Sequence, residues 1–482
     1  MIALELDEVV RVVGGRADAA LCGSARRVCT DSREVKPGDL FFALRGERFD
    51  GHDFVPEVLK RGACAAIVSR PCDTGGPAGA PLIRVADTVE ALGKLAAFHR
   101  TLLSATVIAI TGSNGKTTTK CMIDHVLSRR LRGRASIKSF NNAIGVPLTL
   151  LAANAKDEYL ICEIGTNAPG EVAALATLVS PSVAIVTSIG EEHLEGFGTI
   201  ENIAVEEFSV LGSVRARGLA IANLDHPLAR PMLANFKQLS VVTFGTCREA
   251  DVRVSDIRPR LFETRFRINE RYEASLPMCG AHNAVNAAAA FAVGRRLKIE
   301  PEVIVAALGT FEPPAMRSNV ERLGDITLID DCYNANPASM AAAVDVLKNV
   351  ATGRRVMFAG DMLELGAAAR DRHVQLGASI AKAGIEVLVA VGAMASNVAE
   401  GARRTGSPIE VTEFPDSERA SEQAGSIVGN GDTVLVKGSR GIRMERIVAA
   451  LRTLPGRRGA ERAEDSNRHS SAPATNLSVG RA

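Results

Sequence analysis

Residues 109–120, AITGSNGKTTTK, follow a β-branched run at 106–108 and precede a predicted helix over 117–130. A strand, a loop of small residues and a helix in this order surround a phosphate with backbone N–H groups and the positive end of the helix. Lys116 supplies a cation for the β- and γ-phosphates, and Thr117 supplies a hydroxyl for Mg²⁺. We therefore predict an ATP site. Its residues are Gly112, Ser113, Asn114, Gly115, Lys116, Thr117 and Thr118.

One position departs from the general phosphate-binding loop. That pattern places a glycine five residues before the glycine of the Gly-Lys pair, and this chain has Ile110 there. A Gly-Lys-Thr triplet alone also occurs in loops without a ligand. The strand before the loop and the helix after it favour nucleotide binding.

The composition excludes several classes of protein. Lys plus Arg number 57 against 55 Asp plus Glu, so no overall field attracts nucleic acid. Aromatic residues make up 4% and Trp is absent, which argues against a base-stacking platform. Nine scattered cysteines without a C-x-x-C pair indicate reduced thiols rather than disulfides or a zinc site. An acidic N-terminal stretch and the lack of a long apolar run lead us to expect a soluble, cytoplasmic protein without membrane insertion.

The 482 residues predict an α/β protein of several domains. Residues 1–103 are expected to form a small substrate-binding α/β domain, and residues 104–315 a central ATP-binding domain around a parallel sheet. Residues 316–455 are expected to form a doubly wound, Rossmann-like domain. Residues 456–482 contain almost no large apolar side chain and are expected to be a disordered tail without a catalytic role.

Apolar runs bounded by turn residues give the individual strands of the two outer domains. In the first domain we predict a helix over 88–103 and strands over 40–44, 65–69 and 82–85. In the third we predict strands over 327–329, 355–358, 387–391 and 433–436.

Two polar side chains follow strands of the central domain. Glu163 ends the run at 159–162, and His193 comes shortly after the run at 183–186. Ligands of parallel sheets lie at the carboxyl ends of the strands, so both side chains can converge on a metal that accompanies the phosphates. Each residue alone is equally well explained as an exposed strand end or a helix-entry histidine. Their joint placement favours metal binding.

A series of short motifs is spaced along the central domain. They are TGSNGKT at 111–117, NNAIGVPLTL at 141–150, EIG at 163–165, HLE at 193–195 and GAHNAVNA at 280–287. In this order they resemble the motifs of the Mur ligase family. The resemblance implies the three-domain architecture of that family, with Mg²⁺ bound by Thr117, Glu163 and His193.

The same resemblance implies roles for two asparagine-containing motifs. Asn141 and Asn142 would line the reacting end of the substrate. His282 and Asn283 would contact adenine or phosphate, although an asparagine at a helix start is most simply a cap.

The N-terminal domain contains the motifs DSR at 31–33, PGDLFFALRG at 37–46 and DGH at 50–52. One explanation of these stretches is purely structural, namely that they are capped turns. They also resemble the uridine-nucleotide domain of the Mur ligases that extend the muramoyl peptide. The resemblance implies that Ser32, Arg33, Gly46 and His52 lie near a UDP group.

Glu207 marks a departure from the family pattern. Many relatives carry a lysine at the position we align with Glu207, and CO₂ converts it to a carbamate near a second Mg²⁺. Our hypothesis is that Glu207 supplies this carboxylate directly. The alternative is that Glu206 and Glu207 form an ordinary acidic helix face and that the alignment has slipped by one residue.

The third domain carries the motifs that distinguish branches of the family. DDCYNANPASM at 330–340, GDMLELG at 360–366, MR at 316–317 and KGSR at 437–440 resemble the branch that adds D-alanyl-D-alanine to UDP-N-acetylmuramoyl-tripeptide. The Tyr-Ala-His-x-Pro and Asn-Pro-Arg elements usual in the tripeptide-forming branch are missing. The resemblance implies that Arg317 reaches the phosphates, that Asp331 contacts the ribose and that Asn334 and Asn336 contact the substrate.

The implied activity is amide formation driven by ATP through an acyl phosphate, with Mg²⁺ as cofactor, in the cytoplasmic synthesis of peptidoglycan. The implied reactants are the UDP-linked tripeptide and D-alanyl-D-alanine, and we expect a monomer. The alternatives within the superfamily are a tripeptide-forming ligase and a folylpolyglutamate synthase. An alternative of another class is a P-loop regulator that hydrolyses ATP. The expected catalytic residues are Lys116, Glu163, His193, Glu207 and Arg317.

Overall fold

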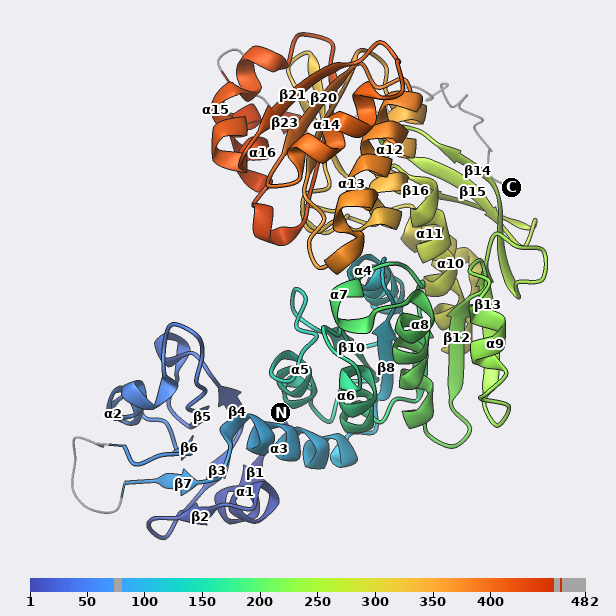
Figure 1. Ribbon diagram of the computed structural model, residues 1–482. Coiled ribbons are helices and arrows are strands. Elements are labelled where there is room, and N and C mark those ends of the chain that lie inside the picture. The colour runs from blue at the N-terminus through green and yellow to red at the C-terminus, as the bar shows by residue number, and fades with distance from the viewer. Residues whose placement is uncertain (73–79, 455–459, 462–482) are drawn as a thin grey trace, which may run out of the picture.

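The computed structural model describes residues 1–72, 80–454 and 460–461. The chain forms three α/β units, each built on its own sheet. Figure 1 shows the N-terminal unit in blue beside the central unit, and the C-terminal unit in orange on a different side of the central unit. The predicted fold class is confirmed. Within the described residues, no helix combines the length and the apolar character needed to cross a membrane.

The N-terminal unit contains a five-stranded sheet of order β2-β7-β6-β5-β4 within the described residues. Strands β4 to β7 are parallel, and β2 is antiparallel to β7. The predicted strands and helix of this unit are confirmed. The elements are β1 (Leu4–Glu5), α1 (Leu6–Val13), β2 (Arg16–Ala17), β3 (Ser24–Ala25), β4 (Arg27–Cys29), β5 (Asp39–Phe42), α2 (Val55–Lys60), β6 (Ala65–Val68), β7 (Leu82–Arg84) and α3 (Thr88–Leu102).

Helix α3 joins the N-terminal unit to the central one. It begins where the Asp87 carboxylate accepts from the backbone N–H groups of Val89 and Glu90. Its buried Arg100 donates to the carbonyls of Val179 and Ser180 in the central unit, at 2.9 and 3.0 Å. Burial lowers the pKa of the Arg100 guanidinium to about 10. A buried side chain bonded to the facing backbone fixes where the N-terminal unit is attached.

The central sheet has the order β16-β15-β14-β13-β12-β11-β8-β10-β9. Strand β8 lies between β10 and β11, with Ile110 level with Glu163 and Thr111 level with Val186. The carboxyl ends of these three parallel strands therefore meet at one edge, as predicted. The strands are β8 (Thr106–Thr111), β9 (Gly133–Ala135), β10 (Tyr159–Glu163), β11 (Val183–Val186), β12 (Leu219–Asn223), β13 (Ser240–Gly245), β14 (Val252–Pro259), β15 (Thr264–Ile268) and β16 (Tyr272–Leu276).

Helices cover both faces of this sheet. Helix α4 follows the phosphate loop and packs against α10, whose alanines at 287–290 are fully buried and allow close approach. Helices α5 and α6 pack against α3. The helices are α4 (Lys116–Leu127), α5 (Gly145–Ala152), α6 (Glu171–Val179), α7 (Leu194–Phe197), α8 (Ile200–Phe208), α9 (Ala229–Leu233), α10 (Ala281–Arg296) and α11 (Pro301–Leu308).

The C-terminal sheet has the order β21-β20-β19-β22-β18-β17-β23, with β17 antiparallel to β18. The predicted strands are confirmed. The elements are β17 (Asn319–Leu323), β18 (Ile326–Asp330), α12 (Pro337–Val350), β19 (Arg355–Gly360), α13 (Ala369–Lys382), β20 (Val387–Val391), α14 (Ala395–Arg403), β21 (Glu410–Phe414), α15 (Ser417–Ile427), β22 (Thr433–Lys437), α16 (Glu445–Arg452) and β23 (Ala460–Glu461).

The predicted tail at 456–482 falls almost entirely outside the described residues. Within it, β23 pairs with β17 in antiparallel register.

Candidate active site

The loop at 112–115 connects β8 to α4 and needs glycine at both ends. Gly112 has φ +123, and a Cβ there would lie 2.3 Å from Thr187 Oγ1 and 2.8 Å from two backbone nitrogens. Gly115 has φ +84, and its Cβ would lie 2.5 Å from Asn286 Oδ1 on α10. These conformations and contacts exclude a side chain. Within the loop, the N–H groups of Ser113 and Asn114 donate to Ser188 and fix the turn. A phosphate would therefore bind at the N–H groups of the first turn of α4.

Lys116 lies at the first position of α4 among carboxylates. Its Nζ donates to the carbonyl of Gly112 at 2.6 Å and to Glu192 Oε1 at 3.4 Å. Burial works to lower the pKa of this ammonium group, but Glu192, Glu207 and Glu163 outweigh it and raise the pKa. Lys116 is therefore charged and available to polyphosphate oxygens.

Glu163 ends β10 directly beside α4. Its Oε1 accepts from Thr117 Oγ1 at 3.1 Å and from Asn141 Nδ2 at 3.3 Å, and its Oε2 lies 3.0 Å from Lys120 Nζ. The side chain is almost fully buried. The predicted neighbourhood of Thr117 and Glu163 is thus present, and Lys120 is a basic partner that the sequence motif did not indicate.

His193 precedes α7 in a left-handed backbone conformation, with φ +52. Its Nδ1 pairs with a carboxylate oxygen of Glu364 from the C-terminal unit. Burial lowers the pKa of the imidazole, which favours the neutral ring needed of a metal ligand.

Glu192, the residue before His193, was not among the site residues predicted from the sequence. Its carboxyl group is buried against Lys116, and burial raises its pKa to about 8. The signal available in the sequence was an acidic pair, Glu191 and Glu192, between the end of β11 and His193.

Glu206 and Glu207 have different surroundings on α8. Glu206 accepts from the backbone N–H groups of Gly170 and Val172, both at 2.8 Å, and so caps the start of α6. Glu207 accepts from Thr111 Oγ1 at the end of β8, and its charge also acts on Lys116. Burial raises the pKa of the Glu207 carboxyl. Of the two, Glu207 therefore lies nearer the phosphate loop.

The C-terminal unit contributes the corner at 333–336 and Arg317. The Arg317 guanidinium stacks 4.0 Å from the ring centroid of Tyr333, whose hydroxyl donates to Ser139 Oγ at 2.7 Å. Arg317 Nε is buried and finds no hydrogen-bond partner among the described residues. Asn336 caps α12 and donates from Nδ2 to Asn114 Oδ1 of the phosphate loop at 3.0 Å. The two units therefore meet over the loop.

These residues surround one cavity of about 440 Å³ between the central and C-terminal units. Glu192, Lys437 and Glu364 also line it. The predicted site residues that line it are Ser113, Asn114, Gly115, Lys116, Thr117, Asn141, Asn142, Glu163, His193, Arg317, Asn334 and Asn336.

Other predicted residues, within the described part of the chain, do not line this cavity. Gly112 belongs to the phosphate loop itself, Thr118 is buried in the first turn of α4, and Glu207 accepts from Thr111 at the end of β8. Asn283 donates to the carbonyl of Cys279 at 2.8 Å and accepts from Asn286, at the start of α10 beside His282. Asp331 pairs with Lys437 Nζ at 2.7 Å. Sequence reasoning did not include Lys437 among the site residues.

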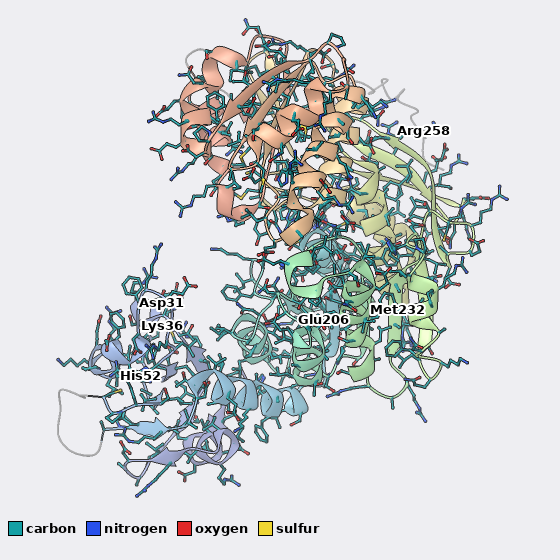
Figure 2. The ribbon with its side chains drawn as sticks, in the orientation of Figure 1. Asp31, Lys36, His52, Glu206, Met232 and Arg258 are labelled. Atoms are coloured by element: carbon teal, nitrogen blue, oxygen red, sulfur yellow. The ribbon has the colours of Figure 1, made fainter. Side chains whose placement is uncertain are left out.

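The predicted UDP-binding residues are on the N-terminal unit and do not line the described cavity. Figure 2 shows Asp31 and His52 on this unit, apart from Glu206 of the central unit. Ser32 and Arg33 form an exposed turn after Asp31. The ring of His52 is buried: its Nδ1 donates to Asp50 at 2.6 Å and its Nε2 accepts from the backbone N–H of Ser69 at 2.9 Å. His52 thus holds the loop that follows Gly46 and leaves its ring nitrogens no further bond.

The predicted magnesium ligands suit an ion shared with phosphate. Within the described residues, no three His, Cys, Asp or Glu side chains gather closely enough to hold a metal by themselves. Magnesium commonly takes one or two protein groups and completes its shell with phosphate oxygens and water. The hydroxyl of Thr117, the carboxylate of Glu163 and the imidazole of His193 line the same cavity and fit that arrangement.

A phosphate loop at a sheet edge, closed over by a second α/β unit that adds Arg317 and Lys437, defines a multidomain P-loop enzyme that acts on a nucleotide. Three family models match the chain: "Mur ligase family, catalytic domain" at 25–100, "Mur ligase middle domain" at 110–294 and "Mur ligase, glutamate ligase domain" at 316–440. The chain belongs to the Mur ligase family.

Individual relatives are similar to this chain over most of its length. The UDP-N-acetylmuramoyl-tripeptide–D-alanyl-D-alanine ligase of Bacillus subtilis (strain 168) is 34% identical over 88% of this chain and 92% of its own. A crystal structure of MurF from Acinetobacter baumannii has a TM-score of 0.85 and 33% identity, covering 93% of this chain and 98% of that one. MurF ligase from Thermotoga maritima in complex with ADP has a TM-score of 0.78 and 27% identity, covering 89% and 97%.

Proposed function

We propose that this protein joins D-alanyl-D-alanine to UDP-N-acetylmuramoyl-tripeptide at the expense of ATP. The observation that carries the proposal is the cavity itself, where the phosphate loop, Glu163 and His193 face Arg317 and the corner at 333–336. The names of the similar ligases and the ADP bound to the Thermotoga maritima structure support the choice of reactants.

The phosphates of ATP would lie on the loop at the start of α4. Lys116 would contact the β- and γ-phosphates, and Arg317 would approach them from the C-terminal unit. Mg²⁺, held by Thr117, Glu163 and His193, would neutralise the charge that develops during transfer. Fixed charges of this kind are usually the largest contribution to catalysis. Asp331 would contact the ribose, with His282 and Asn283 near the adenine end.

The proposed reaction has two steps, formation of an acyl phosphate and then formation of the amide. An oxygen of the tripeptide's terminal carboxylate attacks the γ-phosphorus, the bond to the β-phosphate oxygen breaks, and ADP leaves. The free amine of D-alanyl-D-alanine then attacks the acyl carbon, loses a proton and expels phosphate. Asn141, Asn142, Asn334 and Asn336 would orient the two organic reactants. The covering C-terminal unit would keep water from the acyl phosphate.

The N-terminal unit would bind the UDP end of the acceptor. Ser32 and Arg33 form an exposed turn that can meet a diphosphate or uracil, while His52 would act by holding the loop that contains Gly46. The nucleotide end and the reacting end of the acceptor would then lie on different units, which suits a long substrate.

We retain the hypothesis that Glu207 replaces a carbamylated lysine. Its support is the burial of a carboxyl group below the phosphate loop, next to Lys116 and Thr111. We further propose that the enzyme is a monomer in the cytoplasm. There it would catalyse the last cytoplasmic step in the synthesis of the muramoyl-pentapeptide precursor of peptidoglycan.

The test is phosphate release from ATP by the purified protein with each reactant omitted in turn. The proposal expects release only when Mg²⁺, the UDP-linked tripeptide and D-alanyl-D-alanine are all present, with one pentapeptide per phosphate. Equal release without the acceptor and the dipeptide would indicate a P-loop ATPase instead. Turnover with a single amino acid in place of the dipeptide would indicate another ligase of the superfamily.

A further inference from the structure

The C-terminal unit holds the segment that leads into α7, and the first turn of α7 itself, at three points. The Glu191 carboxylate pairs with Arg372 of α13, and His193 Nδ1 pairs with the Glu364 carboxylate. The backbone N–H of Glu195 donates to the carbonyl of Glu364 at 3.1 Å. A proposed metal ligand of the central unit is therefore fixed from the neighbouring unit.

The backbone at this contact adopts conformations that non-glycine residues rarely take. His193 has φ +52 and Glu364 has φ +63, both in the left-handed region. Gly366 follows with φ +53, and a Cβ there would lie 3.2 Å from the Cα of Glu195. Strained residues persist where the surrounding structure determines them, and they concentrate at functional sites. Here the strain brings an imidazole and a carboxylate together across a unit boundary.

Stability does not explain the pair. The Glu364 side chain is 56% exposed, and ion pairs as exposed as this contribute little to folding. The pair acts instead on the tautomer and the orientation of the His193 ring. A carboxylate only accepts hydrogen bonds, so Nδ1 of His193 carries the proton and the lone pair of Nε2 is left for a ligand. Histidine ligands of metals are commonly oriented in this way by a carboxylate.

We propose that Glu364 is a positioning residue that sets the tautomer and ring orientation of His193, so that the magnesium site is complete only when the C-terminal unit lies against the central one. The inference rests on the proposed function, because it takes His193 as a ligand of the metal. It couples the arrangement of the two units to metal binding through one side chain.

The test measures Mn²⁺ affinity of the full chain by electron paramagnetic resonance, with the non-hydrolysable β,γ-methylene analogue of ATP present. Glu364→Ala is expected to weaken Mn²⁺ binding by about 10- to 100-fold, the usual effect of removing such a partner. Glu364→Gln, which keeps an acceptor oxygen, is expected to recover part of this loss. In a His193→Ala background, Glu364→Ala is expected to change the affinity by less than about twofold.

Arg372→Ala is the matched control, because it removes another side-chain pair across the same boundary, the one with Glu191, and leaves the contact between Glu364 and His193 in place. It is expected to leave Mn²⁺ affinity within about twofold of the unaltered protein. An equal loss in Arg372→Ala and Glu364→Ala would overturn the inference, since contact between the units would then suffice. Unchanged or tighter binding in Glu364→Ala would overturn it as well. If the unaltered protein bound no Mn²⁺ with the analogue, the proposed metal site itself would fail.

Discussion

Asn336 donates from its side-chain nitrogen to Asn114 Oδ1 at 3.0 Å and so ties the start of α12 to the phosphate loop. The side-chain oxygen of Asn336, Oδ1, accepts from the backbone N–H of Ser339 and caps the helix. One side chain thus orients an element of the C-terminal unit and contacts the loop that would carry ATP. The two roles can be separated by mutation.

Asn336→Asp keeps the cap but replaces the donor to Asn114 with a carboxylate. We expect a thermal midpoint close to that of the unaltered protein and a loss in kcat/KM for ATP of at least about tenfold, or about 1.4 kcal/mol. Asn336→Ala should lose the cap as well, with about 1 kcal/mol less stability. Steady-state kinetics and thermal denaturation measure the two effects. Full activity in Asn336→Asp would show that the link to Asn114 is dispensable.

Lys116→Met tests the charge balance around the loop. The substitution removes the cation that Glu192 and Glu207 face, leaving buried carboxyl groups without a counter-charge. We expect kcat to fall by about 10²- to 10³-fold and the thermal midpoint to fall too. Phosphate release at saturating ATP gives the first quantity. A variant that lost stability but kept kcat would exclude Lys116 from phosphate contact.

Glu207 gives a prediction about carbon dioxide. If its carboxylate replaces a carbamate, turnover of the unaltered protein should be the same in buffer freed of CO₂ and in buffer with added bicarbonate. Glu207→Gln should lower turnover and shift the Mg²⁺ dependence, as Glu163→Gln should. The hypothesis fails if Glu207→Gln leaves both unchanged while Glu163→Gln abolishes activity.

His99 on α3 gives a prediction for stability against pH. It is fully buried and accepts from the backbone N–H of Ile2 at 2.9 Å, and burial lowers its pKa from 6.5 to about 4. As the pH falls, His99 therefore becomes protonated near pH 6.5 in the unfolded chain but only near pH 4 in the folded protein. The stabilisation is complete above pH 6.5 and is lost as the pH falls.

Between pH 7.5 and 5 this loss is about 2 kcal/mol. Urea denaturation followed by circular dichroism measures it. His99→Gln cannot titrate and should show a pH dependence smaller by that amount. Equal losses of stability in both proteins over this range would show that His99 does not cause the pH dependence.

The sequence predicted the parts of the site that depend on local order along the chain. Strand ends at β8, β10 and β11 could be placed from apolar runs, and parallel pairing then put Glu163 beside the phosphate loop. The antiparallel strands β14 to β16 were not predicted. Their alternating burial gives a period-two signal that could have been found, but turns and exposed arginines interrupt it.

Contacts between units could not be predicted. Nothing local to Glu364 indicates that it meets His193 across 171 positions of chain, and Lys437 reaches Asp331 only because β22 lies beside β18. The bonds of His52 are a further detail of this kind. The family resemblance implies only that His52 lies near a UDP group, and the structure adds that its ring nitrogens bond to Asp50 and Ser69. Such details depend on the packed structure rather than on the pattern of residues.

An ¹⁸O label shows directly whether the carboxylate of the acceptor, rather than water, attacks ATP. The UDP-linked tripeptide is prepared with ¹⁸O in its terminal carboxylate, and phosphate released with ATP, Mg²⁺ and D-alanyl-D-alanine is examined by mass spectrometry. An acyl phosphate requires one ¹⁸O atom in each phosphate and one amide product for each phosphate. Unlabelled phosphate would mean that water attacks ATP, and it would contradict the ligase mechanism.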